Sequence, residues 1–214
     1  MKKFIRYSFW FLVALVVAFL AFYRLWFLRQ PARHIPHQAS VLVSPANGQI
    51  VSVTHWNSAS LMVTKKTNGF INTWTKDVDT AGTMISIQMT PMHVHYQRAP
   101  SDAVLLAKQH VAGDYNNAIN MSNEFGIRHE NEHNELLFEM PDHRRYKVIQ
   151  IAGFVARRIE DYVQPQQSVH QGDVIGLIKL GSQVTILFSH DVDVVVDKGQ
   201  TVIDGETILG QIRP

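Results

Sequence analysis

The carboxyl-terminal part of the chain contains one motif twice, VQPQQSVHQGDVIG at 163–176 and VDKGQTVIDGETILG at 196–210. In each copy, valine and isoleucine flank turns that contain glycine. Glycine adopts the positive φ that tight turns require, and β-branched residues favour strands. We therefore predict that each copy is a hairpin and that the two hairpins are neighbours in a small β-sandwich or barrel.

The rest of the chain after residue 40 also has the patterns of strands. In the run 183–188, apolar residues at the even positions alternate with Gln, Thr and Leu at the odd ones, which is the two-residue period of a strand. Runs at 41–43, 48–53 and 84–89 are similar. The predicted fold class is a β-rich α+β domain of sandwich or barrel type with duplicated carboxyl-terminal hairpins.

The amino terminus is a long apolar run. Residues 7–23 carry no charge, and the run resumes after Arg24 as far as Leu28, which together is about the 20 residues needed to cross a bilayer. Basic residues flank both ends, so their distribution gives no orientation. A cleaved signal peptide is the alternative, but no small-x-small cleavage site follows the run. The predicted organisation is a transmembrane anchor over 1–29, a linker over 30–39 and one domain over 40–214.

The composition excludes several classes of function. With 214 residues, of which 46% are hydrophobic, the chain has enough apolar matter for a single core. A formal net charge of +2 is too small for the basic surface that nucleic-acid binding uses, so nucleic acid is not an expected partner. The absence of cysteine excludes disulfides, thiolate catalysis and cysteine-ligated metal sites.

Three clusters of polar and turn residues lie at the ends of predicted strands. They are SPANG at 44–48, TPMHVHYQRAP at 90–100 and LGS at 180–182. Such clusters suit a site assembled from loops on a rigid sheet, and each one alone also suits an ordinary β-turn.

Taken in order and spacing, the clusters resemble the phosphatidylserine decarboxylase family in its short, membrane-anchored form. Residues 44–48 are similar to the Ser-Pro-Ala-Asp-Gly turn of the family, and 95–100 to its His-Val-Asn-Arg-Ala-Pro run. Asn-Glu-His-Asn at 131–134 is similar to the family's Asn-Glu-Arg-Asn. The stretch 150–159 leads at family spacing to Gly181-Ser182. The resemblance covers almost the whole chain.

The resemblance implies an enzyme that makes its own cofactor. The hydroxyl of Ser182 would attack the carbonyl of Gly181, and cleavage through an ester would leave a pyruvoyl group on the new amino terminus. This group would supply the electron sink for converting phosphatidylserine to phosphatidylethanolamine and CO2. Glycine fits the first position because it tolerates the strained turn that presents its carbonyl.

The same resemblance implies partners and a location. The large chain ending at Gly181 and the small chain starting at Ser182 are expected to remain associated. The substrate is a membrane phospholipid, no metal is expected, and the domain is expected at the cytoplasmic face of the cell membrane. The sequence leaves open whether the protein forms a homodimer.

The remaining roles are assigned by matching single residues. His95 matches the family's histidine and is the candidate acid–base residue, since an ordinary imidazole titrates near neutral pH. Arg98 is the candidate for binding the carboxylate or phosphate of the lipid, with a plain surface arginine as the alternative. Arg157 is assigned the same task; because neighbours on a strand face opposite sides, at most one of Arg157 and Arg158 points into the site.

The chain departs from the family pattern at several positions. Asn47 stands where the family has an aspartate that orients and polarises the histidine, and an amide cannot stabilise an imidazolium as a carboxylate does. Self-cleavage would then be slow or would recruit another acid, of which Asp102 is the nearest to the histidine run. A processing-defective family member that binds lipid or a partner is therefore the first alternative function.

A membrane-anchored zinc hydrolase is the second alternative. His93 and His95 are two residues apart, which places both imidazoles on one face of a strand. Such a site needs further ligands, for which His55, His110 and His129 are candidates.

Overall fold

The structure is a computed structural model that describes residues 2–57, 74–115, 130–153, 158–179 and 182–213. The helical elements are α1 (Lys2–Ala21) and η1 (Phe22–Phe27). The strands are β1 (Val41–Val43), β2 (Gly48–Asn57), β3 (Ala81–Met89), β4 (Tyr96–Arg98), β5 (Ala103–Val111), β6 (His133–Glu139), β7 (Arg145–Ala152), β8 (Ile159–Asp161), β9 (Ser168–Val169), β10 (Val174–Ile178), β11 (Ser182–Ser189), β12 (Val192–Val194), β13 (Thr201–Val202) and β14 (Ile208–Ile212).

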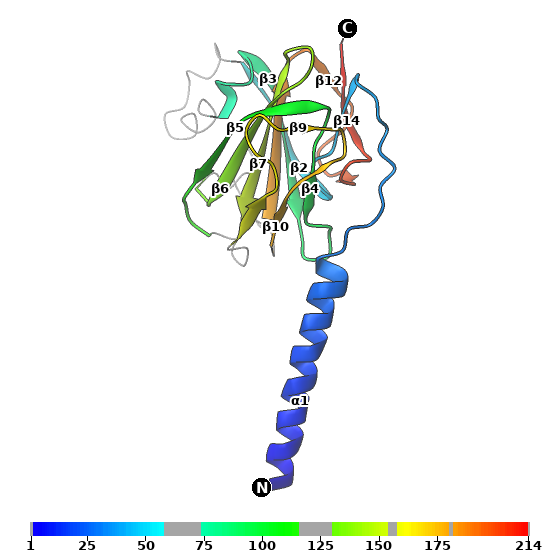
Figure 1. Cartoon of the computed structure of the whole chain (residues 1–214), viewed down its shortest axis with the longest axis vertical. Coiled ribbons are helices and arrows are strands. Elements are labelled where there is room, and N and C mark those ends of the chain that lie inside the picture. The colour runs from blue at the N-terminus through cyan, green and yellow to red at the C-terminus, as the bar shows by residue number, and fades with distance from the viewer. Residues whose placement is uncertain (1, 58–73, 116–129, 154–157, 180–181, 214) are drawn as a thin grey trace.

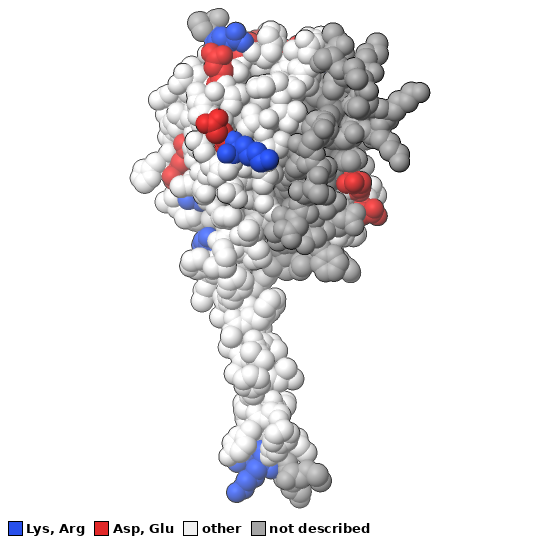
Figure 2. Space-filling view, turned by 180° about the vertical axis from the view of Figure 1, so that it is seen from behind, with Lys and Arg blue, Asp and Glu red and all other residues white. Residues whose placement is uncertain are grey.

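The predicted apolar run forms a helix that projects from the β-rich domain (Figure 1). The helical stretch Lys3–Phe27 is long and apolar enough to cross a membrane, with a mean hydropathy of 2.1. None of this apolar window is buried in the domain. Figure 2 shows an uncharged stem with basic side chains at its free end. A helix of this kind leaves its apolar side chains to be covered by something other than the domain.

The domain is built on one curled sheet of eight strands in the order β13-β2-β3-β11-β7-β6-β5-β9. Its strands pair antiparallel, and β11 lies in the middle between β3 and β7. Two small sheets, β1-β14-β12 and β4-β10-β8, complete a half-barrel (Figure 1). The predicted β-rich fold class with an amino-terminal helix is confirmed.

The core follows from the alternation along the central strands. Val184, Ile186 and Phe188 of β11 are fully buried in the main hydrophobic cluster, which the inner face of the sheet shares with the small sheets. Leu187 points to the other face, where it joins a second cluster with Trp56, Trp74 and Met84 among its members. Both faces of the central strand are thus packed against apolar side chains, so β11 cannot be displaced without exposing both clusters to water.

The two copies of the repeated motif form turns, but the predicted hairpins are wrong. Gly172 and Gly205 do have positive φ values of +88° and +75°. The strands that flank each turn pair elsewhere: β9 with β5, β10 with β4 and β8, β13 with β2, and β14 with β1 and β12. Each turn is a corner that carries the chain from one sheet to another. The copies are neighbours, however, because a Cβ at Gly172 or Gly205 would lie 2.5 or 2.7 Å from Cδ1 of Ile35.

The predicted linker lies along the surface of the domain between the helix and β1 (Figure 1). Arg33 forms an ion pair with the buried carboxylate of Asp204, through Nε at 3.2 Å and through Nη2. The backbone N–H of His34 donates to Glu206 (3.0 Å), and that of Gln38 to Gln171 (3.1 Å). These contacts hold the helix end at a defined place on the domain.

Candidate active site

His95 lies beside the end of the helical segment, because its imidazole centroid is 4.1 Å from that of the Phe27 ring in η1. The helix emerges from this end of the domain (Figure 1). It belongs to the turn after β3 and directly precedes β4. Its backbone carbonyl accepts hydrogen bonds from the N–H of Ile178 (3.2 Å) and from Nε2 of Gln97 (2.6 Å). The first of these bonds ties His95 to the last residue of β10, the strand that leads toward the predicted cleavage site.

Ser182 is the first residue of β11, and its backbone pairs with Met89 of β3 and Ala152 of β7. Ile178 and Ser182 flank the predicted cleavage site. The N–H of Ile178 donates to the carbonyl of His95, and Ser182 pairs with Met89, the last residue of β3 before the turn that leads to His95. Gly181 and the side chain of Ser182 lie outside the described parts of the structure. The backbone therefore brings the start of the predicted nucleophile strand and the predicted base to one end of the domain.

The environment of His95 favours a neutral imidazole with one defined tautomer. Nδ1 lies 2.9 Å from the carbonyl oxygen of His93, and because a carbonyl only accepts, Nδ1 carries the proton. Nε2 is buried, and its lone pair has no hydrogen-bond partner among the residues that the structure describes. Burial lowers the pKa of His95 from 6.5 to about 4, with a smaller contribution from the positive charge of Arg29. An unpartnered, unprotonated nitrogen of this kind can accept a proton from a hydroxyl placed beside it.

Asn47 lies in a turn that is attached to the strand after His95. The carbonyl of Pro45 accepts a hydrogen bond from the N–H of Arg98 (2.9 Å), and the hydroxyl of Ser44 donates to the carbonyl of Ala46 (2.7 Å). Asn47 itself is half-buried, and within the described residues its side chain makes no hydrogen bond to His95. The turn is therefore near the site, and the amide does not polarise the imidazole.

Asp102, the acid suggested as a replacement, is engaged elsewhere. Its Oδ1 accepts a hydrogen bond from the N–H of Gln171 (2.7 Å) and lies 3.7 Å from Nδ1 of His170. These contacts, and the absence of Asp102 from the charges that act on His95, do not support the suggestion, which stays a prediction.

The structure describes only some of the arginines that were predicted to bind the substrate. Arg98 donates from Nε to Asp204 (2.9 Å) and from Nη1 to the carbonyl of Gly172 (2.7 Å), so its guanidinium helps Arg33 to neutralise the buried carboxylate. Its contact with the lipid stays a prediction beside this structural role. Arg157 lies outside the described residues. Arg158 is exposed and pairs with Glu160 (3.2 Å).

The candidate zinc ligands do not converge. His55 bonds to Thr83 (2.8 Å), and His110 bonds to Asn134 (2.7 Å) on another strand pair. His129 lies outside the described residues. In the part of the chain that the structure describes, no group of three or more His, Asp or Glu side chains is arranged to hold a metal ion. The geometry therefore does not favour the zinc hydrolase.

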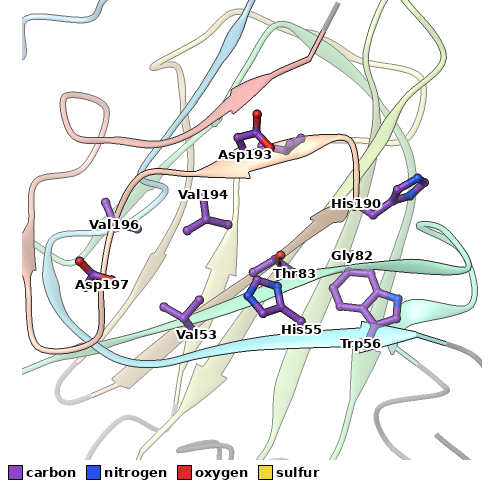
Figure 3. A pocket seen from close by; sticks show the side chains of 11 residues that line it. Val53, His55, Trp56, Gly82, Thr83, His190, Asp193, Val194, Val196 and Asp197 are labelled. Carbon is purple, nitrogen blue, oxygen red and sulfur yellow. Dashed lines mark hydrogen bonds between the residues drawn. The ribbon is translucent and has the colours of Figure 1, made fainter. Parts of the chain in front are cut away.

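A cavity of about 480 Å³ opens at the other end of the sheet (Figure 3). Its lining includes His55, Trp56 and Gly82, together with residues of the β11–β12 turn and β12. Gly82 is at the start of β3 and Met89 at its end, and a strand rises about 3.3 Å per residue, so roughly 20 Å separates this cavity from the start of β11. Apart from His55, which was a candidate ligand for the alternative zinc site, none of the predicted site residues is in its lining.

The structure adds residues to which no role was assigned from the sequence. Gln97 and Gln150 are fully buried beside His95, and Nε2 of Gln150 donates to Oε1 of Gln97 (2.7 Å). Phe27, the last residue of η1, is also fully buried, and its ring centroid is 4.1 Å from that of the His95 imidazole. Phe27 looked like one more residue of the apolar run, and only its place at the end of that run sets it apart.

The buried imidazole of His95, whose Nε2 has no partner among the described residues, lies next to the end of the apolar helix and is compatible with an enzyme of acid–base chemistry. Comparison with known proteins gives the family. The sequence model described as phosphatidylserine decarboxylase matches residues 20–210, and the chain belongs to that family of decarboxylases.

Individual relatives agree with this assignment. The chain is 33% identical to a phosphatidylserine decarboxylase proenzyme of Ehrlichia chaffeensis over 204 residues, which is 94% of this chain and 80% of the relative. It is 34% identical to one of Streptomyces avermitilis over 91% of this chain and 77% of the relative. A putative archaetidylserine decarboxylase proenzyme of Methanosarcina barkeri is 29% identical over 94% and 83%. The predicted family is confirmed.

Proposed function

We propose that this enzyme decarboxylates phosphatidylserine to phosphatidylethanolamine with a pyruvoyl group made from its own Ser182. Membership of the family supports the reaction, and the names of relatives as proenzymes support self-processing. The observation that carries the proposal is the free, buried Nε2 of His95 at the end of the sheet where β11 begins.

Self-cleavage would use the residues of this end of the domain alone. His95 Nε2 takes the hydroxyl proton of Ser182 as Oγ attacks the Gly181 carbonyl. The C–N bond between Gly181 and Ser182 then breaks while the leaving nitrogen receives that proton, which converts the peptide bond into an ester with a free amino group on Ser182. Loss of the Cα proton of Ser182 then expels the Gly181 carboxylate. Hydrolysis of the resulting dehydroalanine releases ammonia and leaves the pyruvoyl group.

The residues that would surround the pyruvoyl group fit it. A new amino terminus at Ser182 would remain held by the pairing of β11 with β3 and β7, at the end of the domain that also contains the Nε2 of His95. When bound, the group supplies the electron sink for loss of CO2. His95 is suited to accept protons in its neutral form. Returning one to the product requires the imidazolium, which the buried site disfavours, so the geometry supports the base role more directly than the acid role.

The substrate would reach the site from the membrane. The helix emerges at the end of the domain that contains His95, which supports a site facing the bilayer surface (Figure 1). The serine head group of a lipid would then need only to tilt out of the interface, which avoids exposing its acyl chains to water. The cytoplasmic orientation stays a prediction, and protease accessibility in sealed vesicles tests it.

Intact mass measured under denaturing conditions, beside a Ser182→Ala control, tests the proposal. We expect two chains that break after Gly181, with the small chain about 17 Da lighter than a serine start would give because ammonia is lost. The control is expected to stay whole. A single uncleaved wild-type chain would contradict the proposal and favour a processing-defective family member. Release of CO2 from phosphatidylserine in vesicles then tests the substrate.

A further inference from the structure

The carboxyl end of the apolar helix contacts the candidate active site. Phe27 is the buried residue of η1, whereas the apolar window of the helix is 0% buried. The Phe27 ring lies at 4.1 Å and 34° from the His95 imidazole. Phe27 also stacks with Tyr23, with ring centroids 5.5 Å apart and an interplanar angle of 8°. The helix therefore ends in an aromatic column whose last member covers the candidate base.

A second contact fixes the helix end to the loop that carries His95. Arg29 donates from Nη2 to the carbonyl of Met92 (2.7 Å) and from Nη1 to that of Trp26 (2.7 Å). Its guanidinium lies 4.3 Å from the centroid of the Trp26 ring. Met92 is in the turn between β3 and β4 that ends at His95. A ring contact and a charge-assisted hydrogen bond thus hold the same turn against the helix.

We propose that Phe27 is a positioning residue for His95, so that the apolar helix is a working part of the active site as well as an anchor. The Phe27 ring and the His93 carbonyl together fix the plane and the tautomer of the imidazole, which leaves only Nε2 free to act. The inference rests on the proposed role of His95 in self-cleavage.

Removal of the ring has two physical consequences. First, the imidazole can turn about its bond to Cβ, and a misplacement of about 1 Å costs a catalytic group about a hundredfold in rate. Second, water reaches the imidazole, so its pKa is expected to rise from about 4 toward its ordinary 6.5. The other charged or titratable groups that act on His95 are His93 and Arg29, and both oppose its protonation in the wild type and in a Phe27 variant.

The first test compares self-cleavage of full-length chains in phospholipid nanodiscs over a range of pH. Phe27→Ala is expected to cleave about tenfold to a hundredfold more slowly than the wild type at neutral pH. As the pH is lowered, the cleavage rate of Phe27→Ala is also expected to begin its decline at a higher pH than that of the wild type. Phe11→Ala is the matched control, because it makes the same substitution in the same helix at a side chain that is 67% exposed. It is expected to behave as the wild type.

The second test does not depend on cleavage. In the uncleavable Ser182→Ala background, the pKa of His95 is measured by NMR of histidine-labelled protein, with and without Phe27→Ala. A raised pKa of His95 in the Phe27→Ala variant supports the positioning role of Phe27. If the wild type does not cleave, this result still stands, and only the proposed function is wrong. If Phe27→Ala does not fold, Phe27→Leu, which keeps apolar volume without a ring, is judged by the same two measurements. Wild-type cleavage and an unchanged His95 pKa in the folded variant would overturn the proposal.

Discussion

Among the single residues, His95 has the property that sets the chemistry. Its low pKa means that it is a base over the whole physiological range, because a histidine acts as a base only when unprotonated. We expect the rate of self-cleavage to be insensitive to pH down to about 5 and to decline as the pH falls through about 4. Time courses of chain appearance in buffers from acid to neutral pH measure this. A midpoint near the ordinary histidine value would contradict it.

The same pKa makes stability depend on pH. In the unfolded chain His95 has its ordinary pKa, so between about pH 6.5 and 4 the unfolded state binds the extra proton. The contribution of His95 to the free energy of unfolding is complete above that window. It decreases as the pH falls, by about 2 kcal/mol between pH 7 and 5. Denaturant unfolding of Ser182→Ala is the measurement. Ser182→Ala combined with His95→Asn should lose less over this interval, and an equal loss would show that other groups are responsible.

Asn47 is the residue at which this chain departs most clearly from its family. Its turn is bonded to β4, and its amide makes no hydrogen bond to His95. Asn47→Asp places a carboxylate there that can stabilise the imidazolium formed in self-cleavage, so we expect processing to accelerate by about tenfold. Gln49→Glu adds the same charge at an exposed position two residues on and serves as control. Equal rates for Asn47→Asp and wild type would remove Asn47 from the mechanism.

Among the elements, the linker is held most firmly by Asp204. This carboxylate is fully buried and pairs with Arg33 from the linker and Arg98 from β4. Asp204→Asn leaves two largely buried guanidinium groups without a counter-charge, which is expected to lower the free energy of unfolding by about 3 to 5 kcal/mol. Urea unfolding of the Ser182→Ala chain measures it. Asp193→Asn, at an exposed pair with Arg213, is the control and should change little.

The elements also show what the sequence could and could not predict. The alternation in β11 and the positive φ at Gly172 and Gly205 are local properties, and both were predictable. The partners of the strands are not local: each repeat turns a corner between sheets, and the glycines of both corners lie against Ile35, far away in the sequence. His95 was found through the family motif, whereas Phe27 belongs to an apolar run whose pattern predicts lipid contact at every position. The role of Phe27 is visible only once the helix end and the loop at Met92 are seen together.

At the scale of the whole molecule, the site and the cavity lie at opposite ends of the large sheet. The site end carries the helix, the Arg29 contact and the start of β11, while the cavity of Figure 3 lies at the far end of β3. The residues proposed for catalysis therefore lie at the end of the domain that carries the helix, where we propose that a membrane lipid would bind. The linker contacts at Asp204 keep the helix and the domain in this relation.

The topology makes a final prediction about the two chains that self-cleavage would produce. The small chain, 182–214, would begin with β11, which pairs with β3 over Ser182–Ser189 and with β7 over Ser182–Phe188. Its later strands β13 and β14 pair with β2 and β1 of the large chain. A central strand buried on both faces cannot leave without opening the core, so both chains are expected to co-elute in native size-exclusion chromatography. They should separate only in denaturant, together with the loss of tertiary structure.

The uncleaved Ser182→Ala chain is the control, and it should elute at the volume of the cleaved wild type. The same elution volume reports whether the particle is a monomer or a homodimer. Release of the small chain in native buffer would mean that cleavage loosens β11. The pyruvoyl group at its amino terminus would then lose the pairing with β3 and β7 that holds it beside His95, so the proposed site could not survive its own activation.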